Sequence, residues 1–125
     1  GFDLSAFNSV TPDRVSLHLT KEPLLLSEAK TAFSINLLEL EDFKEKETLF
    51  DLKVNQDGLC LGLIQWMDVG LHGEIRYENR PGNIKSHWPN PIYMFEKPIE
   101  VESGRKLQVK GTLFRDSVWF DLVKK

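Results

Sequence analysis

The sequence predicts an all-β domain, a barrel or sandwich of about nine mostly antiparallel strands after a short irregular or helical N-terminal arm. Three observations support this fold class. Apolar and polar residues alternate over many short segments, as they do in half-buried strands. Turn-forming residues separate those segments at short intervals. Long segments with the apolar spacing of a helix are absent from the sequence.

Size and charge limit the classes of function. A chain of 125 residues is long enough for one domain with its own core. Its formal charge is −3, with 16 basic and 19 acidic residues well mixed, so we expect no nucleic-acid partner. No apolar run approaches the roughly 20 residues of a membrane span, so we expect no membrane contact. The single Cys60 excludes an internal disulfide and fits a reducing compartment, the cytoplasm or nucleus.

The first residues precede the predicted strands. We expect residues 1–12 to form the short irregular or helical arm and residues 13–125 to form the β domain. Phe2, Leu4 and Phe7 are apolar without obvious partners nearby, which suggests an interface with another surface. An apolar start without an initiating Met indicates a segment of a longer protein.

Several strands are expected in the first half of the chain. Residues 15–19 alternate, and residues 24–26 form a short apolar run. Residues 31–40 give a clearer strand, which the charged stretch at 39–47 ends. Alternation returns over residues 48–55.

A hairpin and a buried strand are expected next. Gln56-Asp57-Gly58 is a strong hairpin signal, because glycine accepts a positive φ. Residues 59–69 are nearly all apolar, which predicts a strand that is covered on both faces and ends near Asp68. Gly62 within it indicates a bulge or a close approach of another backbone.

The second half contains one long loop and several short strands. Residues 78–91 hold three prolines and few apolar side chains, which predicts the loop. Turns are expected at Ser103-Gly104 and at 115–117. The strands predicted around them cover 92–95, 98–101, 106–111 and 118–122.

The chain offers few arrangements of residues that carry chemistry. The potential metal ligands are scattered without paired spacing, so no metal site is expected; they are His18, His72, His87 and Cys60. No glycine-rich turn between a strand and a helix is present to cradle a phosphate. Ser86 or Ser103 could join a catalytic triad on paper, but no nucleophile-elbow motif supports one.

The pair His87-Trp88 leaves two interpretations open. Trp88 can anchor the loop to the core, with His87 as an ordinary loop residue. Alternatively, His87 can pair with a carboxylate while the indole faces a guanidinium. Asp68 is equally ambiguous, since carboxylates at strand ends are usually solvated or capping. Trp66 is expected in the core.

In this order, the segments resemble the C-terminal β-barrel domain of protein arginine N-methyltransferases. Leu61-Gly-Leu-Ile-Gln-Trp-Met-Asp-Val69 resembles the family's Gly-x-x-x-Trp-Phe-Asp-Val strand, and Ser86-His87-Trp88 resembles its Thr-His-Trp loop. The opening Gly1-Phe-Asp-Leu-Ser5 resembles the segment that closes the family's dimerisation arm, which implies that residues 1–12 are the end of that arm. The last matching segment is Pro98-Ile-Glu-Val101 with Gly104 and Gly111. The likeness covers nearly the whole chain.

The resemblance implies a function shared with residues outside this chain. In the family, a Rossmann-like domain binds S-adenosylmethionine and a two-glutamate hairpin clamps the arginine guanidinium of a protein substrate. The barrel supplies the other wall of the arginine channel. Ser86, His87 and Trp88 would line it, and His87 would support the catalytic pocket by pairing with an acidic residue of the cofactor domain. The parent protein would be an enzyme, whereas this fragment alone would bind no cofactor and be inactive.

A second interpretation is structural. Ser86 replaces the family's threonine and Met67 its phenylalanine, and both departures are mild. The chain is most like a tandem-module member, in which it would be the barrel of the second module and end at the natural C-terminus. Second modules can be degenerate, serving as a pseudo-dimer partner for the first. A protein-interaction barrel therefore stays open as the alternative.

Overall fold

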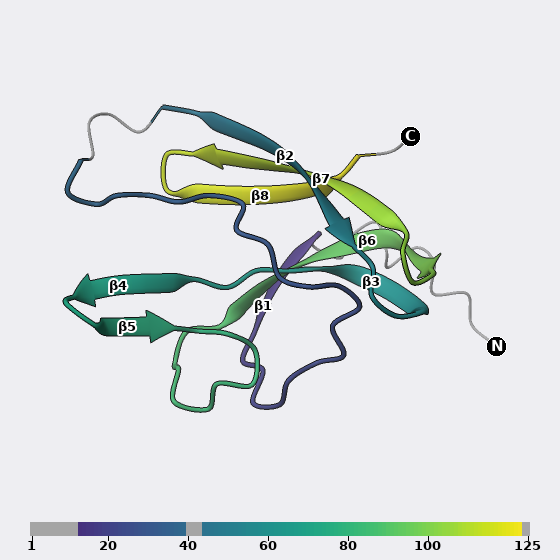
Figure 1. The fold of residues 1–125 in the computed structure, drawn as a ribbon, viewed down its shortest axis with the longest axis horizontal. Helices are drawn as coiled ribbons and strands as arrows, with labels where there is room; N and C mark the ends of the chain where they lie inside the picture. The colour runs from purple at the N-terminus through teal and green to yellow at the C-terminus, as the bar shows by residue number, and fades with distance from the viewer. Residues whose placement is uncertain (1–12, 40–43, 124–125) are drawn as a thin grey trace. The chain divides into compact units, whose positions relative to one another are not determined.

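The computed structural model describes residues 13–39 and 44–123, and within these ranges it is all-β, which confirms the predicted class (Figure 1). The strand pairs run antiparallel, and no helix occurs in the described residues. The strands are β1 (Arg14–Leu17), β2 (Lys46–Lys53), β3 (Gly58–Ile64), β4 (Asp68–His72), β5 (Ile75–Glu78), β6 (Asn90–Val101), β7 (Lys106–Phe114) and β8 (Ser117–Leu122). The predicted arm, with Phe2, Leu4 and Phe7, lies outside the described residues.

The described chain divides into two compact units. The first contains residues 13–24 and 60–99, and the second contains residues 25–59 and 100–123. Strands β3 and β6 contribute residues to both. No helix in the described residues is long and apolar enough to cross a membrane.

In the first unit, β6 lies between β1 and β3 in a three-stranded sheet. Arg14 pairs with Tyr93 and Leu17 with Asn90. Tyr93 is buried, and its hydroxyl donates to the side-chain oxygen of Gln65 at 2.7 Å. A Cβ on Gly62 would overlap the Tyr93 carbonyl oxygen, so the close backbone approach predicted at this glycine is confirmed.

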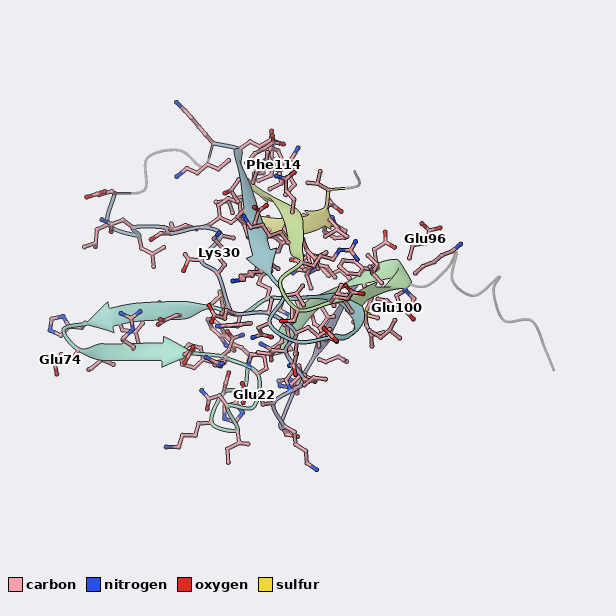
Figure 2. All side chains as sticks on the ribbon, turned by 45° about the vertical axis from the view of Figure 1, so that its right-hand side comes forward. Glu22, Lys30, Glu74, Glu96, Glu100 and Phe114 are labelled. Atoms are coloured by element: carbon pink, nitrogen blue, oxygen red, sulfur yellow. The ribbon has the colours of Figure 1, made fainter. Side chains whose placement is uncertain are left out.

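The same unit contains a two-stranded hairpin, β4–β5. Val69 pairs with Tyr77, and the register shifts by one residue between Gly70 and His72. Its turn contains Gly73, which has a φ of 56°, a conformation that glycine adopts without strain. Glu74 stands at the tip (Figure 2).

In the second unit, β7 is the central strand between β2 and β8. Its residues alternate in burial, with Leu107, Val109 and Leu113 facing inward. Three phenylalanines pack beside it, with the ring of Phe120 6.2 Å from that of Phe33 and 6.3 Å from that of Phe50. Here the strand, its period and the turns at Ser103-Gly104 and 115–117 agree with the sequence prediction.

The strand predicted over residues 31–40 is wrong as far as the structure describes it. Residues 31–39 are irregular, and a turn ends them, where the amide of Glu39 donates to the Asn36 carbonyl at 3.2 Å. Of the apolar residues predicted to share one face, Phe33 packs against Phe120, but Ile35 and Leu37 are 43% and 65% exposed. The short run at 24–26 is not a strand either; a single bridge joins Ser27 to Val54 instead.

The predicted hairpin at Gln56-Asp57-Gly58 is also wrong. The chain only bends at Gln56, Gly58 does not have a positive φ, β2 pairs with β7, and β3 belongs to another sheet. Asp57 accepts a hydrogen bond from the Ser103 amide at 2.7 Å, which joins this bend to a segment distant in the sequence.

The apolar run at 59–69 is divided into β3 and the start of β4, with irregular residues at 65–67. Leu59 and Leu61 are about half exposed, at 55% and 52%, so β3 is not covered on both faces. Asp68 begins a strand rather than ending one. The two strands predicted at 92–95 and 98–101 are one continuous strand, β6.

Candidate functional site

The loop that carries Ser86, His87 and Trp88 is fixed at its base by two buried asparagines. The side-chain oxygen of Asn79 accepts from the Met67 amide at 2.6 Å, and its nitrogen donates to the Pro89 carbonyl at 3.3 Å. The Asn90 side chain donates to the main-chain carbonyl of Asn79 at 2.8 Å. Because buried amides must find partners, these bonds determine where the loop leaves and rejoins the sheet region.

A second set of bonds shapes the loop itself. The Asn83 side chain donates to the Glu78 carbonyl at 2.6 Å and accepts from the Lys85 amide at 3.1 Å. The Asn83 carbonyl accepts from the Ser86 amide at 3.1 Å. Asparagine commonly forms such local bonds in turns, and they lead the chain directly to Ser86.

Gly82 holds the loop against the segment after β1. Its amide donates to the Leu19 carbonyl at 3.0 Å, and its φ is 87°. A Cβ there would come within 3.0 Å of the Glu22 nitrogen. Both the conformation and the space therefore require glycine.

Ser86 and Tyr77 together position Trp88. The Ser86 hydroxyl lies 2.5 Å from the Tyr77 hydroxyl and accepts from the Trp88 amide at 3.2 Å. The Tyr77 and Trp88 rings meet edge to face, with centroids 5.2 Å apart at 65°. Trp88 is 54% exposed, so it packs against Tyr77 but is not part of the buried core.

His87 lies between Ser86 and Trp88 in the sequence, but its side chain faces solvent. It is exposed and forms no hydrogen bond or ion pair with any residue in the described ranges. The loop thus turns Ser86 inward while His87 and Trp88 are accessible. Both ring nitrogens of His87 are available to a group from outside the described residues.

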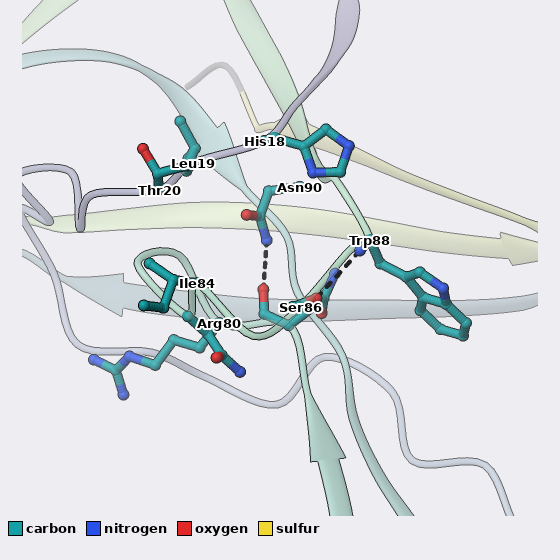
Figure 3. Close-up of a pocket in the computed structure, with 10 residues that line it drawn as sticks. His18, Leu19, Thr20, Arg80, Ile84, Ser86, Trp88 and Asn90 are labelled. Atoms are coloured by element: carbon teal, nitrogen blue, oxygen red, sulfur yellow. Dashed lines mark hydrogen bonds between the residues drawn. The ribbon is translucent and has the colours of Figure 1, made fainter.

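A small cavity lies on the inner side of the loop (Figure 3). Its volume is about 40 Å³, and Ser86 and Trp88 line it together with His18 and Asn79. His87 is not among its lining residues. The cavity can hold water but not a guanidinium group and its side chain. In Figure 3 the Trp88 indole points away from His18.

The acidic and aromatic residues of the preceding segment have local partners. Asp68 accepts two hydrogen bonds from Arg76, at 3.0 and 2.6 Å, and this pairing raises the pKa of the guanidinium. Trp66 is half-buried, and the guanidinium of Arg80 lies 5.8 Å from the centre of its ring. Arg80 also pairs with Glu22 at 3.3 Å. Asp68 and Trp66 are thus scaffold for the hairpin and the loop.

Other sequence candidates do not assemble into a reactive site. No group of three or more potential metal ligands occurs within residues 13–39 and 44–123. Cys60 is a free, half-buried thiol, and burial raises its pKa. Ser103 donates to the Asn55 carbonyl at 3.2 Å, which is a turn contact.

Sequence reasoning missed Tyr77 and the buried pair Asn79 and Asn90. A signal for Tyr77 was present, since Ile75 and Tyr77 alternate directly after Gly73, which is typical of a hairpin strand. The asparagines carry no such signal, because their residue type is common in loops.

The chain is similar to known arginine methyltransferases. It is 28% identical over 101 residues to "Protein arginine N-methyltransferase 2" of Xenopus tropicalis, covering 75% of this chain and 23% of that protein. It is 29% identical over 112 residues to "Arginine N(omega)-methyltransferase" of Streptomyces achromogenes subsp. streptozoticus, covering 88% of this chain and 31% of that protein. A third relative, "Probable protein arginine N-methyltransferase 3" of Oryza sativa subsp. indica, is 24% identical over 117 residues, covering 79% of this chain and 19% of that protein.

The chain therefore spans less than a third of the length of these relatives. A family described as "Arginine methyltransferase oligomerization subdomain" matches residues 1–121, nearly the whole sequence. The β-sheet structure and the Ser86-His87-Trp88 loop stand within that match. The chain belongs to the family of arginine methyltransferase oligomerization subdomains.

Proposed function

We propose that this chain is the substrate-binding β domain of an S-adenosylmethionine-dependent protein arginine N-methyltransferase, and that it forms one wall of the arginine channel. One observation carries the proposal: a loop in a chain of this family exposes His87 and Trp88 while Ser86 is held inward by Tyr77. The partners would be the cofactor-binding domain of the same protein and an arginine-containing protein substrate.

Each exposed side chain suits a role in that wall. The exposed indole of Trp88 can face a guanidinium, an interaction of about 0.5–1 kcal/mol at an exposed site. Its edge contact with Tyr77 fixes the ring before substrate arrives, which lowers the entropic cost of binding. His87 is free to pair with a carboxylate of the cofactor-binding domain and so to hold the pocket closed.

The cavity beside the loop does not fit the cofactor. At about 40 Å³ it cannot hold a nucleoside, and the described residues contain no helix after a glycine-rich turn. We therefore place S-adenosylmethionine, which supplies the methyl group, on the remainder of the parent protein. This chain alone should neither bind it nor methylate arginine. Isothermal calorimetry of the isolated chain with S-adenosylmethionine tests this, and micromolar binding would contradict it.

The channel-wall role is tested by His87→Ala and Trp88→Ala in the full-length protein. We expect kcat/KM for an arginine-containing peptide to fall about tenfold or more in each variant, because positioning contacts are lost. Ile84→Ala is the matched control, since Ile84 is in the same loop and 76% exposed. Its kcat/KM should stay near that of the unaltered protein. Unchanged kcat/KM in both test variants would favour a structural role.

The alternative is a degenerate barrel that acts as a pseudo-dimerisation or protein-interaction module. The family description, an oligomerization subdomain, favours this possibility. It predicts that the His87 and Trp88 variants keep full activity in the parent protein. It also predicts that deleting this domain changes the sedimentation coefficient of the parent protein or lowers its affinity for a protein partner.

A more specific proposal concerns which kind of arginine methyltransferase the parent protein is. We propose that it is a tandem-module enzyme similar to protein arginine methyltransferase nine, with this chain in the second module and a pseudo-dimer contact to the other. We propose the cytoplasm, the nucleus or both as its location, since Cys60 is a free thiol. The residues that precede Gly1 in the full protein test the module: a glycine-rich cofactor loop and a two-glutamate hairpin are expected there.

A further inference from the structure

The hairpin β4–β5 has two chemically different faces. Val69 and Tyr77 are cross-strand partners, and so are His72 and Ile75. Partners share a face, and residues two apart on one strand share it too, so these four side chains lie together. Leu71 lies within the register shift between Gly70 and His72, where two residues, Leu71 and His72, stand opposite Ile75.

This face continues into the candidate site. Leu71 and Ile75 are 65% and 61% exposed near the hairpin end, and Trp88 is 54% exposed at its base. Tyr77 joins the two, because its ring meets that of Trp88 at 5.2 Å. We call the set Val69, Leu71, Ile75, Tyr77 and Trp88 the apolar strip. The Tyr77–Trp88 contact places one end of this set at the proposed arginine entrance, and Leu71 and Ile75 place the other end near the hairpin turn.

The charges of the hairpin are mostly negative. Asp68, Glu74 and Glu78 are opposed by Arg76 alone, and Arg76 is already bound to Asp68. Two carboxylates therefore lack an ion-pair partner among the described residues. A basic segment beside the hairpin would be attracted, whereas an acidic one would be repelled.

The hairpin also has unused backbone edges. In the described part of the chain, β4 pairs only with β5, and β5 only with β4. A two-stranded sheet is marginally stable by itself, and an added strand would cover its edge. An extended segment bound there would place every second side chain on the apolar strip. In Figure 1 the hairpin extends away from β1, which belongs to the same unit.

We propose that the hairpin β4–β5 reads the substrate on one side of the target arginine. The bound segment is extended and basic, and it places a large apolar side chain two residues from the arginine on Leu71 and Ile75. The strip leads to Trp88, and the hairpin residues 68–78 carry three acidic side chains and one basic one, which fits an arginine-bearing segment better than a second copy of this acidic chain. This inference rests on the proposed position of Trp88 at the arginine entrance.

The test measures the affinity of each protein variant for each of two peptides. The peptides each carry one arginine and differ only in having leucine or serine two residues from it on both sides. The full-length protein should bind the leucine peptide more tightly by about tenfold in fluorescence anisotropy, the effect of burying an apolar group. Leu71→Ser with Ile75→Ser should remove that preference while leaving affinity for the serine peptide unchanged. Leu49→Ser, on β2 and 64% exposed, is the control and should retain the preference.

The outcomes separate this inference from the proposed function. If Trp88→Ala weakens both peptides while the hairpin variants leave the leucine preference intact, the hairpin inference is overturned and the channel wall stands. If Trp88→Ala weakens neither peptide, both are overturned. A change in sedimentation coefficient of the double variant would assign the strip to contacts between copies instead. Circular dichroism should show the same thermal midpoint for the double variant and the unaltered protein, because both side chains are exposed.

Discussion

The side chain of Asn90 donates a hydrogen bond to the main-chain carbonyl of Asn79 at 2.8 Å, and both residues are almost fully buried, at 3% and 2% exposure. Asn79 stands at the start of the loop that carries His87 and Trp88, and Asn90 stands at its end. One bond thus closes the loop at its base. The position of both exposed side chains depends on it.

Asn79→Ala should lower the free energy of unfolding by about 2–3 kcal/mol, because it removes a buried side chain that accepts from the Met67 amide and donates to the Pro89 carbonyl. Urea denaturation measures this. Asn83→Ala removes an asparagine from the same loop, but Asn83 is exposed and water can replace its bonds. It should cost less than half as much. Equal losses in the two variants would show that burial is not the cause.

Gly62→Ala should be strongly destabilising, since the added methyl group would overlap the Tyr93 carbonyl and lie 3.1 Å from the Met94 Cα. Overpacking against backbone costs about 1–3 kcal/mol or more. Gly70→Ala is the matched control in the same unit, because its Cβ would meet no atom within 4 Å. Thermal denaturation of the two variants should differ clearly, and similar midpoints would contradict the close approach.

Ser86→Ala should lower both stability and peptide affinity, because it frees Tyr77 and the Trp88 amide together. The expected stability loss is about 1 kcal/mol. Ser86→Thr keeps the hydroxyl and should retain near-full affinity in the full-length protein. If the threonine variant loses as much affinity as the alanine variant, the hydroxyl is not what positions Trp88.

Stability should fall at alkaline pH. Burial raises the pKa of Tyr93 above its ordinary value of 10.0, so the unfolded chain loses this proton first. The stabilising contribution is complete below about pH 10 and is lost as the pH rises through the folded pKa. Pairing with carboxylates also raises the pKa values of Arg76 and Lys110, with the same sign at higher pH.

Tyr93→Phe tests the tyrosine contribution. Urea titrations at neutral pH and above pH 10 should show a shallower alkaline loss in the variant. At neutral pH the variant should be less stable by about 1 kcal/mol, because Gln65 loses its hydrogen-bond donor. An alkaline loss as steep as that of the unaltered protein would assign the effect to other groups.

The alternation of apolar and polar residues in the sequence correctly predicts strands that have one buried and one exposed face. In β7 the buried Leu107, Val109 and Leu113 alternate with more exposed neighbours, and the sequence shows that period directly. Residues 31–39 show the same period, but they have no strand partner in the described chain, and Leu38 is 96% exposed. An alternating pattern shows which side chains of a segment could be buried, but it does not show whether another strand is present to pair with the segment.

A turn signal in the sequence does not show which distant strand a given strand pairs with. Gln56-Asp57-Gly58 predicts a hairpin, but the chain only bends at Gln56, and β2 pairs with residues of β7 that are 53 to 67 positions away in the sequence. The candidate loop shows the same limit. Its residues Ser86, His87 and Trp88 are recognisable in the sequence, whereas the contacts that orient them come from Tyr77 and Asn79 through hydrogen bonds. Such contacts depend on packing that no local pattern encodes.

The division of the chain between two units has a consequence for its synthesis. The chain passes from one unit to the other after Leu24, Leu59 and Ile99. The sheet of β1 and β3 requires β6, and the sheet of β2 requires β7. A ribosome must therefore release most of the chain before either sheet can close. Until then, β2 and β3 have unpaired edges that a chaperone can bind, and contacts of such long range predict slow folding.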